Sequence, residues 1–141
     1  MLLEVLTAVR TLFNQSGATS SLFPNLYLSL APDLKEFPRC VLTVVNSTPT
    51  YNTGNTAVTS VGVQFSVFTD ANTEEGGDIQ ALSGIAAIKG VFDFSSLTFG
   101  GGVTNVVVMR TNEGLMREDE QTWHAFVEYQ IEVNEPLPAR S

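Results

Sequence analysis

The sequence contains little charge, and basic residues are the scarcest part of it. Charged residues make up 16% of the chain, below the ~25% of an ordinary soluble domain. Only 7 residues are Lys or Arg, against 15 Asp and Glu, which gives a formal net charge of −8. The basic residues are scattered singly, whereas phosphate binding needs clustered cations. The composition therefore argues against capture of nucleic acid.

Cysteine and long apolar runs are also lacking. The one thiol, Cys40, cannot form an internal disulfide, so no secreted disulfide scaffold is indicated. Its β-prone neighbours favour a buried structural thiol over a nucleophile. No stretch approaches the ~18 apolar residues of a membrane-spanning helix. Glu4 and Arg10 interrupt the apolar start, which argues against a signal peptide. We expect a soluble protein without a membrane partner.

The length predicts one domain, placed at residues 1–135, with a short tail at 136–141. Apolar residues from Leu2 to Phe13 recur in steps of three and four, which predicts a helix ending near Gly17. A second helix is expected from the capping-box spacing of Asn72 and Glu75. Its predicted stop is Lys89-Gly90, and its predicted buried stripe is Ile79, Leu82, Ile85, Ala86 and Ile88.

Four segments carry strand patterns: Arg39 to Thr48, Ser60 to Val67, Val103 to Met109 and Trp123 to Val133. The first is β-prone on both faces, which favours a central position in the sheet. The connector from Ala18 to Phe37 leaves room for a short strand at Leu26 to Leu30. We predict an α+β domain, with a mainly antiparallel sheet of about four strands and both helices packed on one face. Asn46 to Asn55 and Thr111 to Gln121 are predicted as turn and polar loop.

Few residues offer chemistry. His124, the only histidine, shares the outward face of the last strand with Glu128 and Glu132. Positions four apart on a strand are about 13 Å apart, so these carboxylates cannot share a metal with His124. The Gly100 to Gly102 run lacks a Walker signature, and Glu118 to Glu120 lacks the spacing of a calcium loop. No catalytic residue, cofactor site or metal site is predicted, and a metal-dependent or hydrolytic enzyme using His124 remains as the rival interpretation.

Two aromatic side chains occupy faces that should be polar. Phe126 lies between His124 and Glu128, and Phe68 interrupts the polar side of the second strand. Either the connector or a helix covers them, or another copy of the protein does, since exposed apolar patches mark interfaces.

The whole pattern resembles the tail-terminator, or tail-completion, proteins of long-tailed bacteriophages. The resemblance covers nearly the whole chain and lies in length, element order and pattern, without a catalytic motif. Beyond the short first helix, the proline-containing crossing and the acid-capped helix, it is carried by Phe37-Pro38-Arg39, Gln64-Phe65-Ser66-Val67-Phe68 and Trp123-His124-Ala125-Phe126-Val127-Glu128-Tyr129. Other neck or tube components, such as head-completion proteins, are the nearest alternative.

The resemblance implies a non-enzymatic virion component without a cofactor, assembled in the host cytoplasm. Members of this family form a ring, typically hexameric, that caps the tail tube, ends its polymerisation and presents a surface to the head connector. The implied partners are further copies of the chain, the tail tube protein and the head–tail connector, with DNA only as transit cargo. Six copies at −8 each total −48, and an acidic lumen would repel phosphates and let DNA slide.

Long polar loops on a small sheet carry contacts more often than packing, so we expect contacts in the hairpin Thr48 to Thr56 and in the loop Thr111 to Gln121. The candidate subunit or tube contacts are Pro49, Tyr51, Asn52, Glu113, Leu115, Met116, Arg117 and Phe126. The candidate channel-facing acids are Glu118, Asp119 and Glu120.

Overall fold

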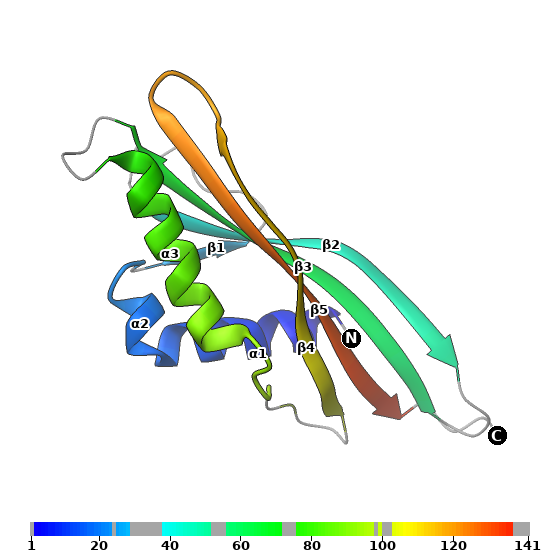
Figure 1. Cartoon of the computed structure of the whole chain (residues 1–141). Coiled ribbons are helices and arrows are strands. Elements are labelled where there is room, and N and C mark those ends of the chain that lie inside the picture. Colours follow the sequence, from blue (N-terminus) through cyan, green and yellow to red (C-terminus); the bar gives the residue numbers. More distant parts are fainter. Residues whose placement is uncertain are drawn as a thin grey trace.

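A computed structural model of the chain describes residues 2–23, 25–28, 38–51, 56–71, 76–97, 99 and 103–136. These residues form an α+β domain, as predicted, of three helices and one five-stranded sheet (Figure 1). The helices are α1 (Leu2–Gln15), α2 (Gly17–Ser20) and α3 (Gly77–Phe92). The strands are β1 (Leu26–Leu28), β2 (Arg39–Tyr51), β3 (Thr56–Asp70), β4 (Thr104–Arg117) and β5 (Thr122–Pro136).

The sheet has the strand order β1-β2-β3-β5-β4. β1 pairs with β2 in parallel, and the other three pairings are antiparallel. The predicted count of about four strands is one too low, because the short segment in the connector is a strand. Within the described residues, β1 pairs with β2 only as far as Leu42. β3 and β5 are therefore the central strands, and the prediction of a central position for the Arg39 to Thr48 segment is wrong along most of its length.

One face of the sheet carries the helices and the core. From α1, Val5, Val9 and Phe13 are fully buried, in agreement with the predicted amphipathic pattern. The ring of Phe65 on β3 lies at the centre of an aromatic cluster, with ring centroids 4.8 to 6.2 Å away on the following partners: Phe13, Phe92 and Tyr129. Burial of these large apolar side chains, at ~25 cal/mol per Å², is the main stabilising contribution to the fold.

α1 ends at Gln15, close to the predicted end near Gly17, but the way it ends and both ends of α3 differ from the predictions because tertiary contacts set them. Gly17 does not close α1 in a left-handed conformation but opens α2, where the buried Thr19 hydroxyl donates to the Phe13 carbonyl at 2.7 Å. α3 begins at Gly77, after Gly76 with φ +86°, and the predicted capping box lies outside the described residues. α3 also continues past its predicted stop at Lys89-Gly90 and ends at Phe92.

The buried face of α3 is rotated from the predicted stripe. Ile85 and Ile88 are buried, but Ile79 is 59% exposed, Leu82 is 48% exposed and Ala86 is exposed. The buried side instead carries small residues, since larger ones would clash there. A Cβ on Gly84, for example, would stand 2.8 Å from Cζ of Phe23. The small residues let α3 lie close to the sheet, as expected, and leave larger apolar side chains on its outer side.

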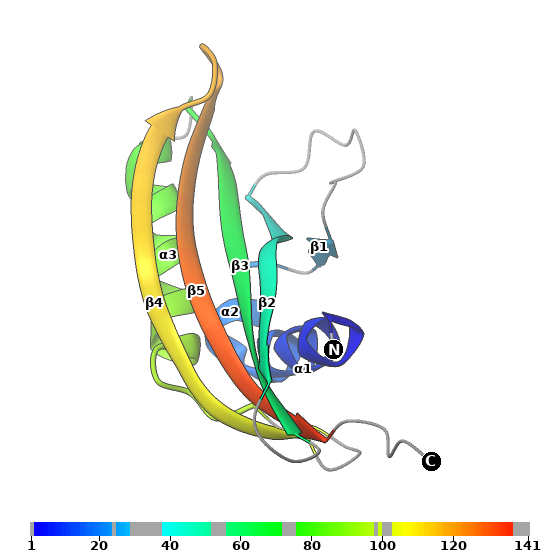
Figure 2. The ribbon, with the colours of Figure 1, turned by 90° about the vertical axis from the view of Figure 1, so that its right-hand side faces the viewer.

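The strands are longer than the sequence patterns indicate. Residues 46–51 belong to β2 and residues 111–117 belong to β4, so the described part of the predicted turn and most of the predicted polar loop are strand. Both hairpins therefore run past the helices, at opposite ends of the sheet (Figure 2). The tip of the β2–β3 hairpin, residues 52–55, lies outside the described residues.

Candidate functional site

The face of the sheet opposite the core helices is formed by alternate residues of four strands. At one end of this helix-free face, cross-strand pairing places Arg39, Phe68, His124 and Met116 in a row across β2, β3, β5 and β4. The Phe68 ring lies between two neighbours: the Arg39 guanidinium is 4.9 Å from its centroid and the stacked His124 ring 4.5 Å. Stacking and cation–π attraction hold this row together.

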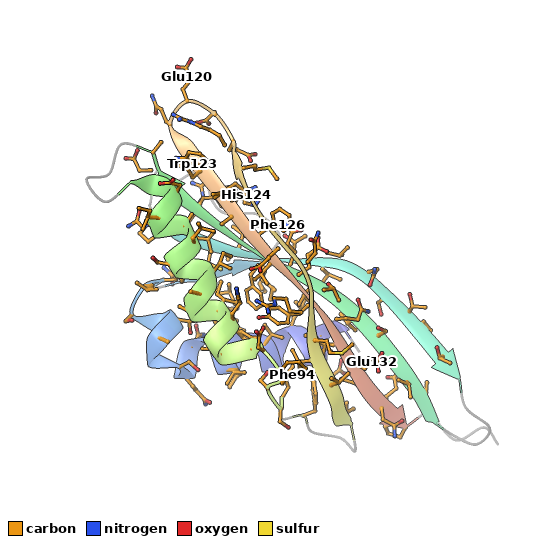
Figure 3. All side chains as sticks on the ribbon, viewed as in Figure 1. Phe94, Glu120, Trp123, His124, Phe126 and Glu132 are labelled. Atoms are coloured by element: carbon orange, nitrogen blue, oxygen red, sulfur yellow. The ribbon has the colours of Figure 1, made fainter. Side chains whose placement is uncertain are left out.

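His124 is held by its surroundings. Its Nδ1 lies 3.2 Å from Oε2 of Glu118 at the β4–β5 tip, and its side chain is 13% exposed. Glu128 and Glu132 follow along β5, as the alternation predicted. Figure 3 shows Glu132 farther along the strand from His124. Within the described residues, no three His, Cys, Asp or Glu side chains gather as metal ligands. The contacts of His124 are those of a packing and hydrogen-bonding residue.

Phe126 occupies the next row, where β4 supplies a glycine. The Phe126 ring lies over Gly114, and a Cβ at Gly114 would stand 2.6 Å from its Cε1. Phe68 and Phe126 are both half-buried, and they form one aromatic patch with His124, whose centroid is 6.1 Å from that of Phe126.

The rest of the helix-free face is polar and acidic. Glu128 and Glu132 lie on it, opposite Gln64 and Ser60 of β3. Among the paired positions of this face, Arg39 at the far end is the one basic residue. The middle of this face therefore carries negative charge without a nearby cation.

The β4–β5 tip holds its acidic residues in defined positions. Arg117 Nε donates to the Asp119 carbonyl at 3.1 Å and Nη2 to the Glu120 carbonyl at 2.5 Å. The Arg117 guanidinium also lies 5.4 Å from the Trp123 ring centroid. The peptide N–H of Glu118 donates to the Thr122 carbonyl at 2.9 Å. Arg117 thus fixes the tip from which these acids project, with Glu120 at its end (Figure 3).

The predicted contact residues fall in three places. Pro49 and Tyr51 lie near the end of β2, and Asn52 lies outside the described residues. On β4, Glu113 and Leu115 are opposite Val127 and Ala125 of β5 and so belong to the helix side, whereas Met116 pairs with His124 on the helix-free side. The structure does not bring this set together into one site.

Sequence reasoning missed a surface formed by α3 and β4. Phe94, just after α3, is 80% exposed and has a φ of +54°. It follows Asp93, which accepts a hydrogen bond from the buried Tyr129 hydroxyl at 2.6 Å. Burial, with the Asp93 contact, raises the pKa of Tyr129. No periodicity marks Phe94, because its exposure depends on the turn that joins α3 to β4.

Comparison with solved structures finds a chain with the same fold. One solved chain aligns with a TM-score of 0.74 at 14% identity, covering 95% of this chain and 97% of its own length. That chain is part of the "Virion of native gene transfer agent (GTA) particle". A search of curated proteins returned no match.

The family is shown by a sequence profile. The profile of "Tail completion protein gp17" matches residues 7–134, so the chain belongs to the tail completion protein gp17 family. It is a structural component of the phage virion tail, as the resemblance implied. No helix among the described residues has the length and apolar character to span a membrane.

Proposed function

We propose that the protein assembles into a ring that caps the tail tube, ends tube polymerisation and offers a joining surface to the head connector. Family membership supports this role. The supporting observation on the molecule itself is a sheet with two different edges that no described residue pairs with: β4 on one side and β2 beyond Leu42 on the other.

Two unlike edges favour a closed ring. An exposed edge presents unpaired backbone N–H and C=O groups that accept another strand. A contact between β4 of one copy and β2 of the next is head-to-tail, and such contacts close into rings when the rotation fits. Pro49 and the bulge between Val44 and Asn46 limit the pairing on β2. Neighbouring copies would therefore meet mainly around Thr43 and Val44, with Tyr51 and Asn52 left for the tube.

In such a ring the helix-free face would line the channel. Glu128 and Glu132 would then face DNA along the wall, and Glu118, Asp119 and Glu120 would stand at the channel mouth. The negative charge repels phosphates, so DNA passes without binding. The domain at 1–135 is one assembly unit in this proposal. Its partners are the neighbouring copies, the tube protein and the head connector.

Tail-length control tests the proposal directly. Tube protein polymerised in vitro should stop growing, and its ends should carry a ring of extra density, when this chain is added. A variant with Thr43→Pro and Val45→Pro removes two backbone N–H donors from the stretch of β2 beyond Leu42, and we expect it to lose capping. Proline at the exposed position Glu120 serves as the control for an added proline.

Unchanged tube lengths in the presence of the wild-type chain would refute capping. Binding to purified head connector without binding to tubes would favour a head-completion role instead. For the channel-mouth acids, the matched variant is Glu118→Gln, Asp119→Asn and Glu120→Gln, which should cap tubes normally and change only DNA passage.

A further inference from the structure

α3 and β4 together present a surface with an apolar hollow at one end and a projecting aromatic side chain at the other. We name this surface the α3–β4 flank and define it by Leu82, Lys89, Asp93, Phe94, Arg110, Glu113 and Leu115. The hollow measures about 350 Å³, and its lining combines apolar residues with one ion pair: Leu82, Ile85, Ala86, Gly114, Leu115 and Phe126, with Lys89 and Glu113. A cavity of about 150 Å³ already holds a benzene ring, so a phenyl group fits.

Phe94 is the projecting side chain. It is 80% exposed, and its peptide N–H donates to the Val108 carbonyl of β4 at 3.1 Å, which fixes the turn beside β4. Figure 3 shows Phe94 at the C-terminal end of α3. A bulky residue with positive φ is a backbone outlier, and such outliers gather at functional sites. The chain therefore keeps an exposed aromatic ring at a conformationally costly position.

The charged residues between hollow and ring alternate in sign. Lys89 Nζ is 3.1 Å from Glu113 Oε2, Arg110 Nη1 is 3.7 Å from Glu113 Oε1, and Arg110 Nη2 is 3.6 Å from Asp93 Oδ2. The order from hollow to ring is thus positive, negative, positive, negative. All four side chains are partly exposed, from 27% to 47%, so they are available to a partner.

This order is self-complementary under a two-fold rotation. When two flanks meet antiparallel, Lys89 faces Asp93 of the partner subunit and Glu113 faces Arg110 of the partner subunit. The same rotation brings each Phe94 toward the hollow of the other copy. A parallel arrangement would instead oppose like charges, which is destabilising. We propose that the free protein forms a two-fold dimer through the α3–β4 flank, with Phe94 of each copy seated in the hollow of the other.

The dimer has a consequence that rests on the proposed ring. The flank lies along β4, whose free edge the ring would use, so a paired subunit is held back from ring closure. Separation of the dimer would then precede capping, and subunits would not close rings away from a tube.

Sedimentation velocity over a range of protein concentrations tests the dimer without any tube. The wild-type chain should show a monomer–dimer equilibrium. Phe94→Asp should weaken the dimer by about 30-fold or more, the size expected for an aromatic anchor seated in a pocket. Leu28→Asp is the matched control: Leu28 is 39% exposed on β1, at the opposite edge of the sheet from β4, and its replacement should leave the dimer unchanged.

Cysteine pairs distinguish the two-fold contact from a head-to-tail one. The native Cys40 is fully buried and does not compete. Oxidised Phe94→Cys, Leu82→Cys protein should give covalent dimers only. A ladder of larger species, no cross-linked product, a monomeric wild type, or a Phe94→Asp dimer of wild-type affinity would each overturn the proposal. Tube capping by the same variants is measured separately. Failure of the dimer therefore leaves the ring proposal standing, and failure of capping leaves the dimer proposal standing.

Discussion

At the residue scale, Phe94 combines backbone strain with exposure. Its φ of +54° places a bulky side chain in the left-handed region, which costs roughly 1–2 kcal/mol for an L-residue. At 80% exposure the ring recovers little of this by burial within its own chain. A contact with a second copy would supply the missing stabilisation.

Replacing Phe94 by glycine therefore separates strain from assembly. In urea unfolding at low concentration, Phe94→Gly should raise the stability of the monomer by about 1 kcal/mol, because glycine adopts positive φ without penalty. Phe94→Ala keeps a Cβ and should give no such gain. Equal stability of the glycine and alanine variants would contradict the strain interpretation.

The Tyr129 hydroxyl predicts how stability depends on pH. Burial and the Asp93 hydrogen bond raise the pKa of Tyr129 in the folded state, above the value of about 10 in the unfolded chain. A raised phenol pKa gives a stabilisation that is complete below pH ~10 and is lost as the pH rises further. Tyr129→Phe should cost about 1 kcal/mol at pH 8 and should lose less stability than the wild type between pH 8 and 11. Parallel curves for both proteins would refute this assignment.

At the scale of the elements, two glycines of α3 have opposite roles. A Cβ on Gly77 would stand 2.5 Å from the Asp70 carbonyl oxygen and 2.7 Å from Cδ1 of Trp123, whereas a Cβ on Gly90 meets nothing within 4 Å. Gly77→Ala should destabilise the fold by about 1–3 kcal/mol. Gly90→Ala should stabilise it by up to about 1 kcal/mol. Thermal unfolding of both variants tests these two expectations. Unchanged stability of Gly77→Ala would show that the close approach of the start of α3 to Asp70 and Trp123 is not required.

Local patterns predicted the elements that bury a regular stripe and failed where pairing overrides composition. α1 and β5 follow their periodicity closely. Residues 46–51 and 111–117 are rich in turn formers, yet each pairs with a neighbouring strand. Pro49 is tolerated because β2 is an edge strand there, where a missing N–H leaves no ladder bond broken.

The candidate surfaces were predictable only in part, for a related reason. The outward positions of His124 and Phe126 followed from alternation along β5. The row from Arg39 to Met116 needs the strand order, and the charge pattern from Lys89 to Asp93 needs the packing of α3 beside β4. Neither the strand order nor the packing of α3 beside β4 can be inferred from periodicity along a single sequence.

At the scale of the whole molecule, charge is separated between faces. The helix-free face carries Glu128 and Glu132, while Lys89 and Arg110 lie on the helix side in ion pairs. In the proposed ring, the carboxylates of Glu128 and Glu132 in each copy would thus face the passing DNA.

A single charge reversal in this wall tests the channel. Glu128→Lys changes the charge of each copy by +2 on the helix-free face, and Thr7→Lys with Thr11→Lys makes the same change on the exposed side of α1. Both variants should cap tubes to wild-type length, since neither position lies on a sheet edge. Particles carrying Glu128→Lys should release DNA more slowly at low salt and recover at high salt, because phosphate contacts are screened by ions. Slowing by the α1 variant to the same degree would show that total charge, rather than the face that carries it, governs the passage of DNA.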